Sequence, residues 1–413
     1  MGNLGNDKLY KGKNVIMRVF LFQVWCVFFL FLLPSLYGIK VNEIRVFGNE
    51  HTKRETILQI SSEFLNEKDW EEKELEMLAR RVEERLINTT WFYSAQVSIV
   101  PSKRGEEYRN VIIEVTEGFL LRFDGGYAYG MFGMDNIGGS GEKLLVYLGY
   151  NRQGVSFLLN PFLYYFFVGG RIGNFNDSYY SSSFEKIDVQ KVGVNLEGGY
   201  RFSWDSKLAL SGGYEWVLDS KYQFIFHNYF IRLQHIIDTR DNIFSAFRGY
   251  RVSIGYDVLR FQYPVFGVDA RIFIPIYESA RLAFRGSVEE GRDLPQEYKR
   301  HLGGIDGIRS DGKEGRLGNV KIQLSMEGRI ELFRTSLLGL FNISFELAGF
   351  WDVGKCFENV SEIYFVSFSD YVQGFGGGIR VYFLEPVFLT LRFEVGFDKT
   401  GVWKVFLDMN EPF

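Results

Sequence analysis

Apolar and polar residues alternate along most of the chain after about residue 119. In segment 320–332 every second residue is Val, Ile, Leu, Met or Gly, and the residues between them are Lys, Gln, Ser, Glu or Arg. A period of two predicts a β-strand with one apolar and one polar face. Comparable segments predict about sixteen strands, at 119–129, 131–137, 142–151, 154–162, 164–174, 189–203, 206–217, 223–237, 249–260, 266–276, 280–290, 319–332, 340–352, 374–384, 387–398 and 402–413.

Residues 39–117 show a different pattern. The elements that it predicts are, in order, a strand at 39–47, a helix that begins at Thr52, a second helix at 69–86, and strands at 95–100 and 110–116. Glu55 stands three residues after Thr52, as in a capping box. Apolar residues form one stripe along the second helix. This β-α-α-β-β order predicts a small α+β domain with two helices on one face of a three-stranded sheet.

The first 38 residues contain a long apolar run at 19–36, which four basic residues precede. Small residues within 35–38 offer a cleavage site, so we expect residues 1–38 to be a signal peptide. Met17 is an alternative start, because the segment that it begins has the form of a signal peptide by itself. An uncleaved membrane anchor is the other interpretation. After this segment the sequence contains one cysteine, Cys356, which excludes an internal disulfide.

Composition narrows the class of protein. The 413 residues include 45 Gly, 41 Phe and 24 Tyr but only 8 Pro, which favours long strands joined by tight turns. The formal net charge of −4 gives no reason to expect nucleic acid as a partner. A mean hydropathy of −0.07 argues against a bundle of membrane-spanning helices. It is compatible with a membrane barrel, in which half of the strand residues are polar.

The apolar faces of the strands can point inward to a core, as in a soluble β-sandwich, or outward to lipid. The predicted signal peptide favours lipid, and the alternating segments are long enough to cross a bilayer at a tilt. Short connections such as 204–205 alternate with long ones such as 291–318, and the last strand ends on Phe413. We therefore expect residues 118–413 to form a sixteen-stranded transmembrane antiparallel β-barrel, preceded by the small α+β domain.

The long connection 291–318 has motif content that resembles the BamA-type outer-membrane assembly and translocation family. In that family the loop before the twelfth strand folds back into the barrel and carries a Gly-Gly and then a Val/Leu-Arg-Gly-aromatic tetrad. The matching residues here are Gly303, Gly304, Ile308 and Arg309. Ser310 and Asp311 stand in place of the Gly and the aromatic residue. The resemblance implies a loop that enters the lumen.

In the family this arginine pairs with acidic residues on the lumen wall. Segment 350–354, Phe-Trp-Asp-Val-Gly, resembles the family's aromatic-x-Asp-x-Gly motif on the thirteenth strand, and Glu327 corresponds to a glutamate on the twelfth. The alternation independently places Asp352 and Glu327 on the polar, lumen face. The resemblance thus implies that Arg309 pairs with Glu327 and Asp352, and that Glu327, Asp352 and Gly354 anchor the loop on the barrel wall. The plainer alternative is an exposed arginine in a loop and two ordinary acidic residues.

Further segments resemble the same family in the same order. They are the turns at 135–141 and 241–242, the glycine-rich strand at 374–381, and the last strand, whose Phe413 corresponds to the C-terminal insertion signal. The domain at 39–117 resembles a POTRA domain, with matching residues at 46–49 and 91–92. A generic α+β module is the alternative for this domain.

The resemblance implies a protein of the bacterial outer membrane, with its POTRA domain in the periplasm, that inserts or translocates other proteins by strand addition at the barrel seam and at the POTRA edge. The implied partners are unfolded outer-membrane or secreted β-proteins, outer-membrane lipid and periplasmic accessory proteins. A two-partner-secretion-like translocator and a passive porin or channel are the alternatives. We expect no catalytic residue, metal or cofactor. The sequence has no G-x-x-x-x-G-K-[ST] motif, and its four His residues lack a convincing Ser or Asp partner.

Overall fold

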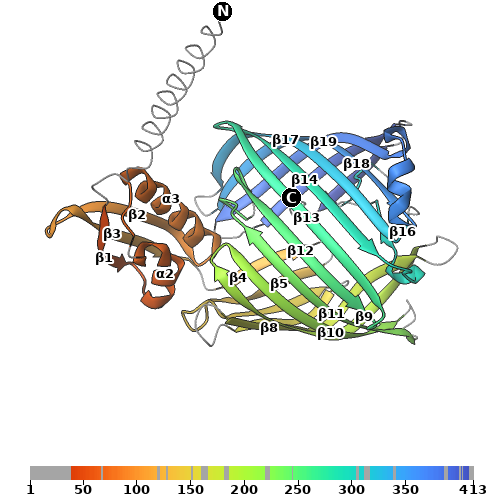
Figure 1. Cartoon of the computed structure of the whole chain (residues 1–413), viewed down its shortest axis with the longest axis horizontal. Helices are drawn as coiled ribbons and strands as arrows, with labels where there is room; N and C mark the ends of the chain where they lie inside the picture. Colours follow the sequence, from red (N-terminus) through yellow and green to blue (C-terminus); the bar gives the residue numbers. More distant parts are fainter. Residues whose placement is uncertain are drawn as a thin grey trace, which may run out of the picture.

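A computed structural model of the chain describes residues 39–66, 68–118, 121–126, 129–149, 152–159, 166–180, 186–218, 224–243, 245–303, 307–310, 317–337, 341–385, 389–399, 401 and 403–408. The predicted signal peptide, Gly304, Asp311 and Phe413 lie outside these described residues. Figure 1 shows two parts, a small domain with helices and, beside it, a large barrel of strands.

The small part, here called the N-terminal domain, has the predicted order of elements. It contains β1 (Lys40–Phe47), α2 (Arg54–Ile60), η1 (Ser62–Leu65), α3 (Glu72–Asn88), β2 (Phe92–Ser102) and β3 (Gly105–Glu117). The sheet order is β1-β3-β2, with β1 parallel and β2 antiparallel to β3. Both helices pack on one face of this sheet, where their apolar side chains and those of the strands form a single buried core.

Apolar spacing explains how α3 packs, although its start and that of α2 differ from the prediction. The side chains of α3 that face the sheet are all buried and are Leu75, Leu78, Val82 and Leu86. The helix begins after Glu71, whose backbone N–H donates a hydrogen bond to the Glu74 carboxylate at 3.3 Å.

The prediction that Thr52 caps α2 is wrong. That helix begins at Arg54 without a side-chain cap, and Thr52 instead contacts the barrel.

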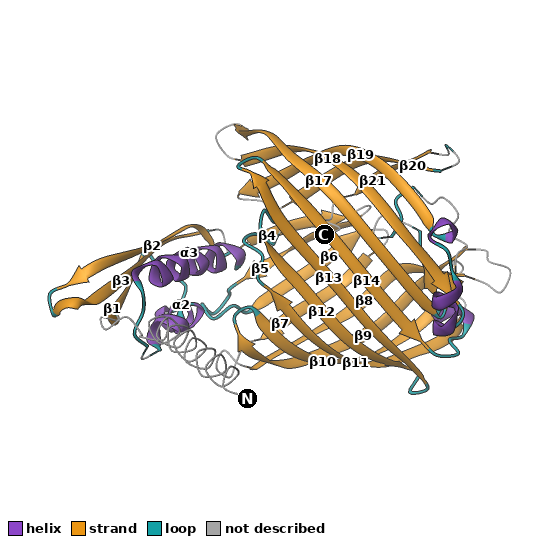
Figure 2. Ribbon diagram, turned by 45° about the horizontal axis from the view of Figure 1, so that its top comes forward, coloured by secondary structure: helices purple, strands orange, loops and turns teal. Residues whose placement is uncertain are grey.

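Within the described residues, the large part is a sheet of sixteen strands, each antiparallel to its neighbours, which curls into a barrel (Figure 2). The strands are β4 (Leu121–Gly126), β5 (Tyr129–Asp135), β6 (Lys143–Gly149), β7 (Arg152–Leu159), β8 (Phe166–Tyr180), β9 (Lys186–Ser203), β10 (Ser206–Leu218), β11 (Phe224–Asp238), β12 (Gly249–Leu259), β13 (Tyr263–Tyr277), β14 (Ala280–Gly291), β17 (Val320–Leu337), β18 (Phe341–Phe357), β19 (Val372–Glu385), β20 (Leu389–Asp398) and β21 (Trp403–Asp408). The predicted sixteen-stranded antiparallel barrel is confirmed, and β4 and β21 are the two edges of the described sheet.

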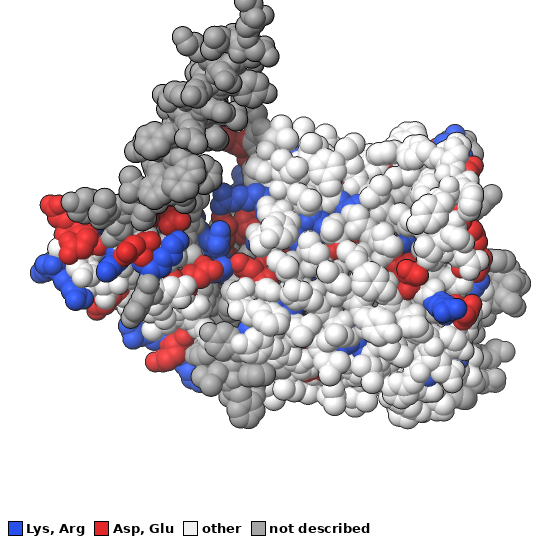
Figure 3. Space-filling model, viewed as in Figure 1, with Lys and Arg blue, Asp and Glu red and all other residues white. Residues whose placement is uncertain are grey.

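The apolar faces of the strands point out of the barrel. On β17, Leu324 is 55% exposed and Ile330 is 49% exposed. The polar residues that alternate with the apolar ones in this part of the strand are at most 7% exposed and are Gln323, Ser325, Glu327 and Arg329. Figure 3 shows the result as a broad barrel face with few charged side chains. In a soluble sandwich the apolar faces of the strands point inward, whereas here they are exposed around a polar interior. This arrangement is expected of a barrel that lies in lipid. Among the described helices, none is both long and apolar enough to cross a membrane.

The two ends of the barrel differ. The N-terminal domain lies at one end, called proximal here, where the turns between strands are mostly short (Figure 2). The distal end carries the two longest connections of the barrel, 292–319 and 358–371. The first contains η2 (Gln296–Tyr298) and the two-stranded pair β15 (Arg300–His301) and β16 (Leu317–Gly318). The second contains η3 (Val360–Phe365) and η4 (Phe368–Asp370).

Candidate functional site

The connection 292–319, called the lumen loop here, folds back into the barrel. Leu302 and Ile308 are fully buried, and the backbone N–H of Ile308 donates a hydrogen bond to the carbonyl of Leu302 at 2.9 Å. Gly303 forms a parallel bridge with Ile308. These contacts turn the chain back on itself and bring Arg309, which is 2% exposed, against the inner wall.

Three glycines on the inner wall make room for the tip of this loop. A Cβ on Gly354 of β18 would lie 2.8 Å from the Cδ1 atom of Leu302 in the loop. On Gly374 of β19 it would lie 1.7 Å from the Oγ of Ser310, and on Gly396 of β20 it would lie 2.9 Å from the carbonyl oxygen of Arg309. Since real Cβ atoms do not approach this closely, the tip can rest on the wall only where side chains are absent.

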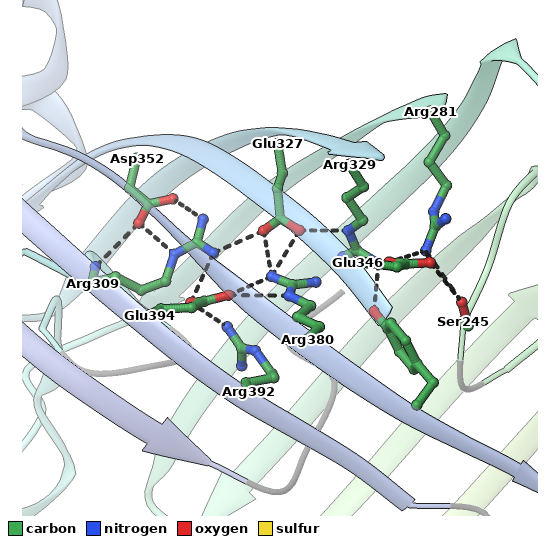
Figure 4. A network of polar contacts seen from close by, with 11 residues as sticks. Ser245, Arg281, Arg309, Glu327, Arg329, Glu346, Asp352, Arg380, Arg392 and Glu394 are labelled. Carbon is green, nitrogen blue, oxygen red and sulfur yellow. Dashed lines mark hydrogen bonds and ion pairs between the residues drawn. The ribbon is translucent and has the colours of Figure 1, made fainter. Parts of the chain in front are cut away.

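Asp352 of β18 holds the guanidinium of Arg309 at two points (Figure 4). Arg309 Nε donates to Asp352 Oδ2 at 2.9 Å and Nη2 donates to Oδ1 at 2.8 Å, while the backbone N–H of Arg309 also donates to Oδ2 at 3.1 Å. The ring of Phe350, on the same inner face, lies with its centre 3.6 Å from the guanidinium carbon. A two-point charged pair and a ring contact together fix the position and the plane of the guanidinium.

Two further carboxylates reach the same guanidinium. Arg309 Nη1 lies 2.8 Å from Oε2 of Glu327 on β17 and 3.3 Å from Oε2 of Glu394 on β20. Both carboxylates are fully buried. One side chain of the lumen loop is thus bonded to three strands of the wall.

Arginines of the wall surround these carboxylates. Arg380 Nη2 donates to Glu327 at 2.8 Å and to Glu394 at 2.6 Å, and Arg392 Nη2 donates to Glu394 at 2.7 Å. Arg329 Nε donates to Glu327. In such a buried network each charge is compensated only while its partners are present, and loss of one partner typically costs about 3–5 kcal/mol.

A second buried ion pair extends toward the proximal end. Arg281 of β14 donates to Glu346 of β18 at 2.8 Å, and the hydroxyl of Ser245 lies 3.2 Å from Arg281 Nη2 and 3.3 Å from Glu346 Oε1 (Figure 4). Ser245 belongs to the proximal connection 239–248. Asn88, at the end of α3, exchanges hydrogen bonds of 3.0 and 3.1 Å with the backbone of that connection. One connection therefore contacts both the lumen charges and the N-terminal domain.

An ion pair docks α3 on the β9–β10 turn. Arg85 is buried and donates to Asp205 in that turn at 3.1 and 2.6 Å and to Glu63 at 3.2 Å. Burial alone would lower the pKa of Arg85, but the two carboxylates outweigh it and the pKa is raised. Trp204 of the same turn packs against the core of the N-terminal domain. The charged pair and the apolar contact hold the domain against the barrel.

The turn between β5 and β6 makes a second contact with the domain. Asn136 Nδ2 donates to the hydroxyl of Thr52 at 2.8 Å. The carbonyl of Gly139 accepts hydrogen bonds from the hydroxyl of Thr56 at 2.9 Å and from the backbone N–H of Lys53 at 3.0 Å. The start of α2 is thus paired with a barrel turn.

Glu142 fixes the shape of that turn. Its carboxylate accepts hydrogen bonds from the backbone N–H groups of Gly138 at 3.0 Å and Ser140 at 3.1 Å. Burial alone would raise the pKa of Glu142, but the backbone N–H groups outweigh it and hold the pKa below its usual range. Gly141 has a φ of +88°, and a Cβ there would lie 2.7 Å from the indole of Trp91, so both backbone and space require glycine.

The structure brings most of the residues singled out from the sequence to one place on the inner wall: Gly303, Ile308, Arg309, Glu327, Asp352 and Gly354. Sequence reasoning did not identify Glu394, Arg380 or Arg392 as part of this site. Glu394 and Arg392 lie on the polar face of a predicted strand, so the alternation of polar and apolar residues indicates that both side chains face the lumen. Their distance from Arg309, however, depends on the register of several strands.

No protein-family model and no curated protein sequence matches the chain. Solved structures share its fold. BamA from Haemophilus ducreyi lacking POTRA domains 1–3 is 14% identical and aligns with 90% of this chain and 83% of its own, with a TM-score of 0.51. CdiB from Escherichia coli is 13% identical over 90% of this chain and 76% of its own, with a TM-score of 0.57. CdiB from Acinetobacter baumannii is 13% identical over 91% and 74%, with a TM-score of 0.52. The chain therefore has the fold of the BamA-type outer-membrane β-barrel family.

Proposed function

We propose that this protein is an outer-membrane assembly factor that inserts or translocates β-barrel or secreted proteins. The observation that carries the proposal is the fixed lumen loop, in which Arg309 is bonded to Asp352, Glu327 and Glu394 inside a barrel of BamA-type fold. The proposed activity is not enzymatic and requires no catalytic group, metal or cofactor.

The proposal assigns each part of the chain a place. Residues 1–38 are a signal peptide, residues 39–117 are a POTRA domain in the periplasm, and residues 118–413 are the barrel in the outer membrane. Phe413 is the C-terminal insertion signal. The proximal end is then periplasmic and the distal end faces the outside of the cell.

Strand addition is the physical basis of the proposed activity. In the described sheet β4 and β21 are the edges, and in the N-terminal domain β1 and β2 are the edges. Backbone groups at an edge can pair with an extended segment of an incoming chain. In lipid each unpaired backbone group costs several kcal/mol, so a client strand that pairs at the barrel seam is stabilised there. The network across β17, β18, β19 and β20 keeps the wall beside β21 in fixed register.

The contents of the lumen argue against a passive porin. The tip of the lumen loop, with Leu302, Ile308 and Arg309, is buried against the wall, and Arg309 is bonded to side chains of the wall rather than directed at an open channel. A porin of this size would have an aqueous lumen. Conductance of the purified protein in planar bilayers that Arg309→Ala leaves unchanged would support the channel instead.

Depletion of the protein in its own cells tests the proposal. We expect the amounts of several other outer-membrane barrels to fall, and a plasmid copy with Arg292→Ala, at an exposed loop position, to restore them better than a copy with Arg309→Ala. Unchanged barrel levels together with the loss of one secreted protein would show a dedicated translocator. No change in barrels or in secreted proteins would refute the proposal.

A further inference from the structure

The outer face of β18 changes along its length. Leu347 and Trp351 are 47% and 37% exposed, as expected of side chains that face lipid. Val353 and Phe357 follow on the same face, closer to the distal end, and are only 3% and 2% exposed. The strand alternation alone gives no reason for this difference, so another part of the chain covers the outer face there.

The cover is the connection 358–371, called the rim segment here, which lies at the distal end of the barrel (Figures 1 and 2). The ring of Phe368 lies 6.3 Å from that of Trp351, and the ring of Tyr371 lies 6.2 Å from that of Phe357. Helix η3 also contacts β18. The rim segment therefore packs on the outside of the wall, where neighbouring strands face lipid.

Polar contacts hold both ends of the rim segment. At its start, Lys299 Nζ lies 2.6 Å from the Glu358 carboxylate, and Asn319 Nδ2 donates to the Glu358 carbonyl at 3.1 Å. Near its end, Lys399 Nζ donates to the carbonyl of Ser369 at 3.5 Å. These contacts fix the orientation of the segment on the barrel.

The exposed surface of the rim segment is rich in aromatic side chains. Tyr364 is 83% exposed, Phe365 is 88% exposed and Phe368 is 57% exposed. Adjacent large aromatic side chains that are this exposed mark a surface that another phase or partner covers.

The surface continues a row of aromatic residues on the lipid-facing wall. The row crosses four neighbouring strands near their distal ends through register pairs, and its members are Trp351, Phe375, Phe397 and Trp403. The rings of Phe375 and Phe397 stack at 6.1 Å. Such a row is typical of the aromatic girdle that a membrane barrel places at the boundary between acyl chains and headgroups. Phe368 joins the rim segment to this row through its contact with Trp351.

We propose that the rim segment is a membrane-interface anchor, in which Tyr364, Phe365 and Phe368 insert into the boundary between acyl chains and headgroups of the distal leaflet. The occupant of this surface is lipid, because the surface is continuous with the lipid-facing wall and consists of aromatic rings, which favour that boundary. The anchor ties the distal ends of β18 and β19 to the membrane. This inference needs only the barrel to span a membrane and does not rest on the proposed assembly activity.

Fluorescence quenching tests the anchor. Full-length protein with Cys26→Ser and Cys356→Ser receives one new cysteine, at Phe365→Cys, and is labelled with an environment-sensitive nitrobenzoxadiazole probe in phosphatidylcholine vesicles. The matched control carries Arg292→Cys, which is also exposed at the distal end but lies on the lumen loop. Heat-modifiable migration on a gel confirms that both variants are folded.

We expect the probe at 365 to be quenched severalfold more strongly than the probe at 292 by lipids that carry a spin label near the headgroup. We also expect it to be shielded from aqueous iodide. Strong quenching by iodide with weak quenching by the spin-labelled lipid would overturn the proposal. Shielding from both quenchers that appears only at high protein density would also overturn it, because a second copy of the chain would then cover the surface.

Discussion

Arg309 in the lumen loop and Asp352 on β18 share three hydrogen bonds, although 43 residues separate them in the chain. Two of these bonds use the guanidinium and one uses the backbone N–H of Arg309. The pair thus fixes both the side chain and the main chain of the loop tip. Glu327 on β17 and Glu394 on β20 add two further strands to the same contact.

Replacement of Arg309 is expected to destabilise the barrel. Arg309→Ala leaves buried carboxylates without one of their partners, a change that typically costs about 3–5 kcal/mol. Arg309→Lys keeps the charge but loses the planar two-point geometry, so it should have a smaller effect. The temperature at which the folded gel band disappears measures both. Arg292→Ala, at an exposed position of the same loop, is the control. Equal transition temperatures for all four proteins would contradict this account of the network.

The fit of the loop tip on the wall predicts a clash that a second change relieves. Gly374→Ala places a methyl group where the Ser310 hydroxyl now lies, and we expect the loop tip to be displaced. Ser310→Gly removes the obstacle and should restore part of the lost stability in the double variant, a coupling that a double-mutant cycle measures. Gly349→Ala is the control, because its Cβ would lie 3.9 Å from its nearest neighbour. Additive effects of Gly374→Ala and Ser310→Gly would show that the two residues do not press on each other.

Loss of the Arg85 ion pair is expected to loosen the docking of the N-terminal domain. Arg85→Ala removes the link to Asp205 and leaves that carboxylate without the guanidinium. Spin labels at Met77→Cys on α3 and Tyr277→Cys at the proximal end, both exposed positions, report the distance between the two parts. We expect its distribution to broaden for Arg85→Ala and to stay narrow for Arg109→Ala, which changes an ion pair within the domain. A narrow distribution in both variants would show that the apolar contacts are sufficient to hold the N-terminal domain against the barrel.

Acid is expected to loosen the same docking through Glu142. The pKa of Glu142 is lowered in the folded protein, so its contribution is complete above the unfolded pKa of about 4.3 and is lost as the pH falls through the lower folded value. The spin-label distribution should therefore broaden below about pH 4. With Glu142→Gln this part of the pH response should disappear. An identical pH response in Glu142→Gln would assign the effect to other carboxylates.

The positions of the strands, and the direction in which their apolar faces point, can be predicted from the alternation of polar and apolar residues along the sequence. A period of two on β17 is a property of consecutive residues, so it predicts both the strand and the lumen position of Glu327. The same reasoning placed Asp352 on the inner face of β18. The resemblance to a known family supplied the further expectation that Arg309 lies near both of them.

Contacts that depend on three-dimensional neighbours could not be derived in this way. Glu394 meets Arg309 because β20 and β17 lie on either side of β18 and β19 at a particular register. Thr52 has the sequence signature of a helix cap, but its hydroxyl accepts a hydrogen bond from Asn136, 84 residues further along the chain. The rim segment gave no regular pattern, because its contacts are set by the wall of β18 on which it packs.

Assembly activity can be measured directly as the folding of a denatured outer-membrane barrel protein into vesicles that contain the purified protein. The fraction of folded client is followed in time by its heat-modifiable migration on a gel. Assembly by strand addition predicts severalfold faster folding with the wild-type protein than with empty vesicles or with vesicles that contain Arg309→Ala. Equal folding rates in all three kinds of vesicle would show that the protein does not assemble barrels.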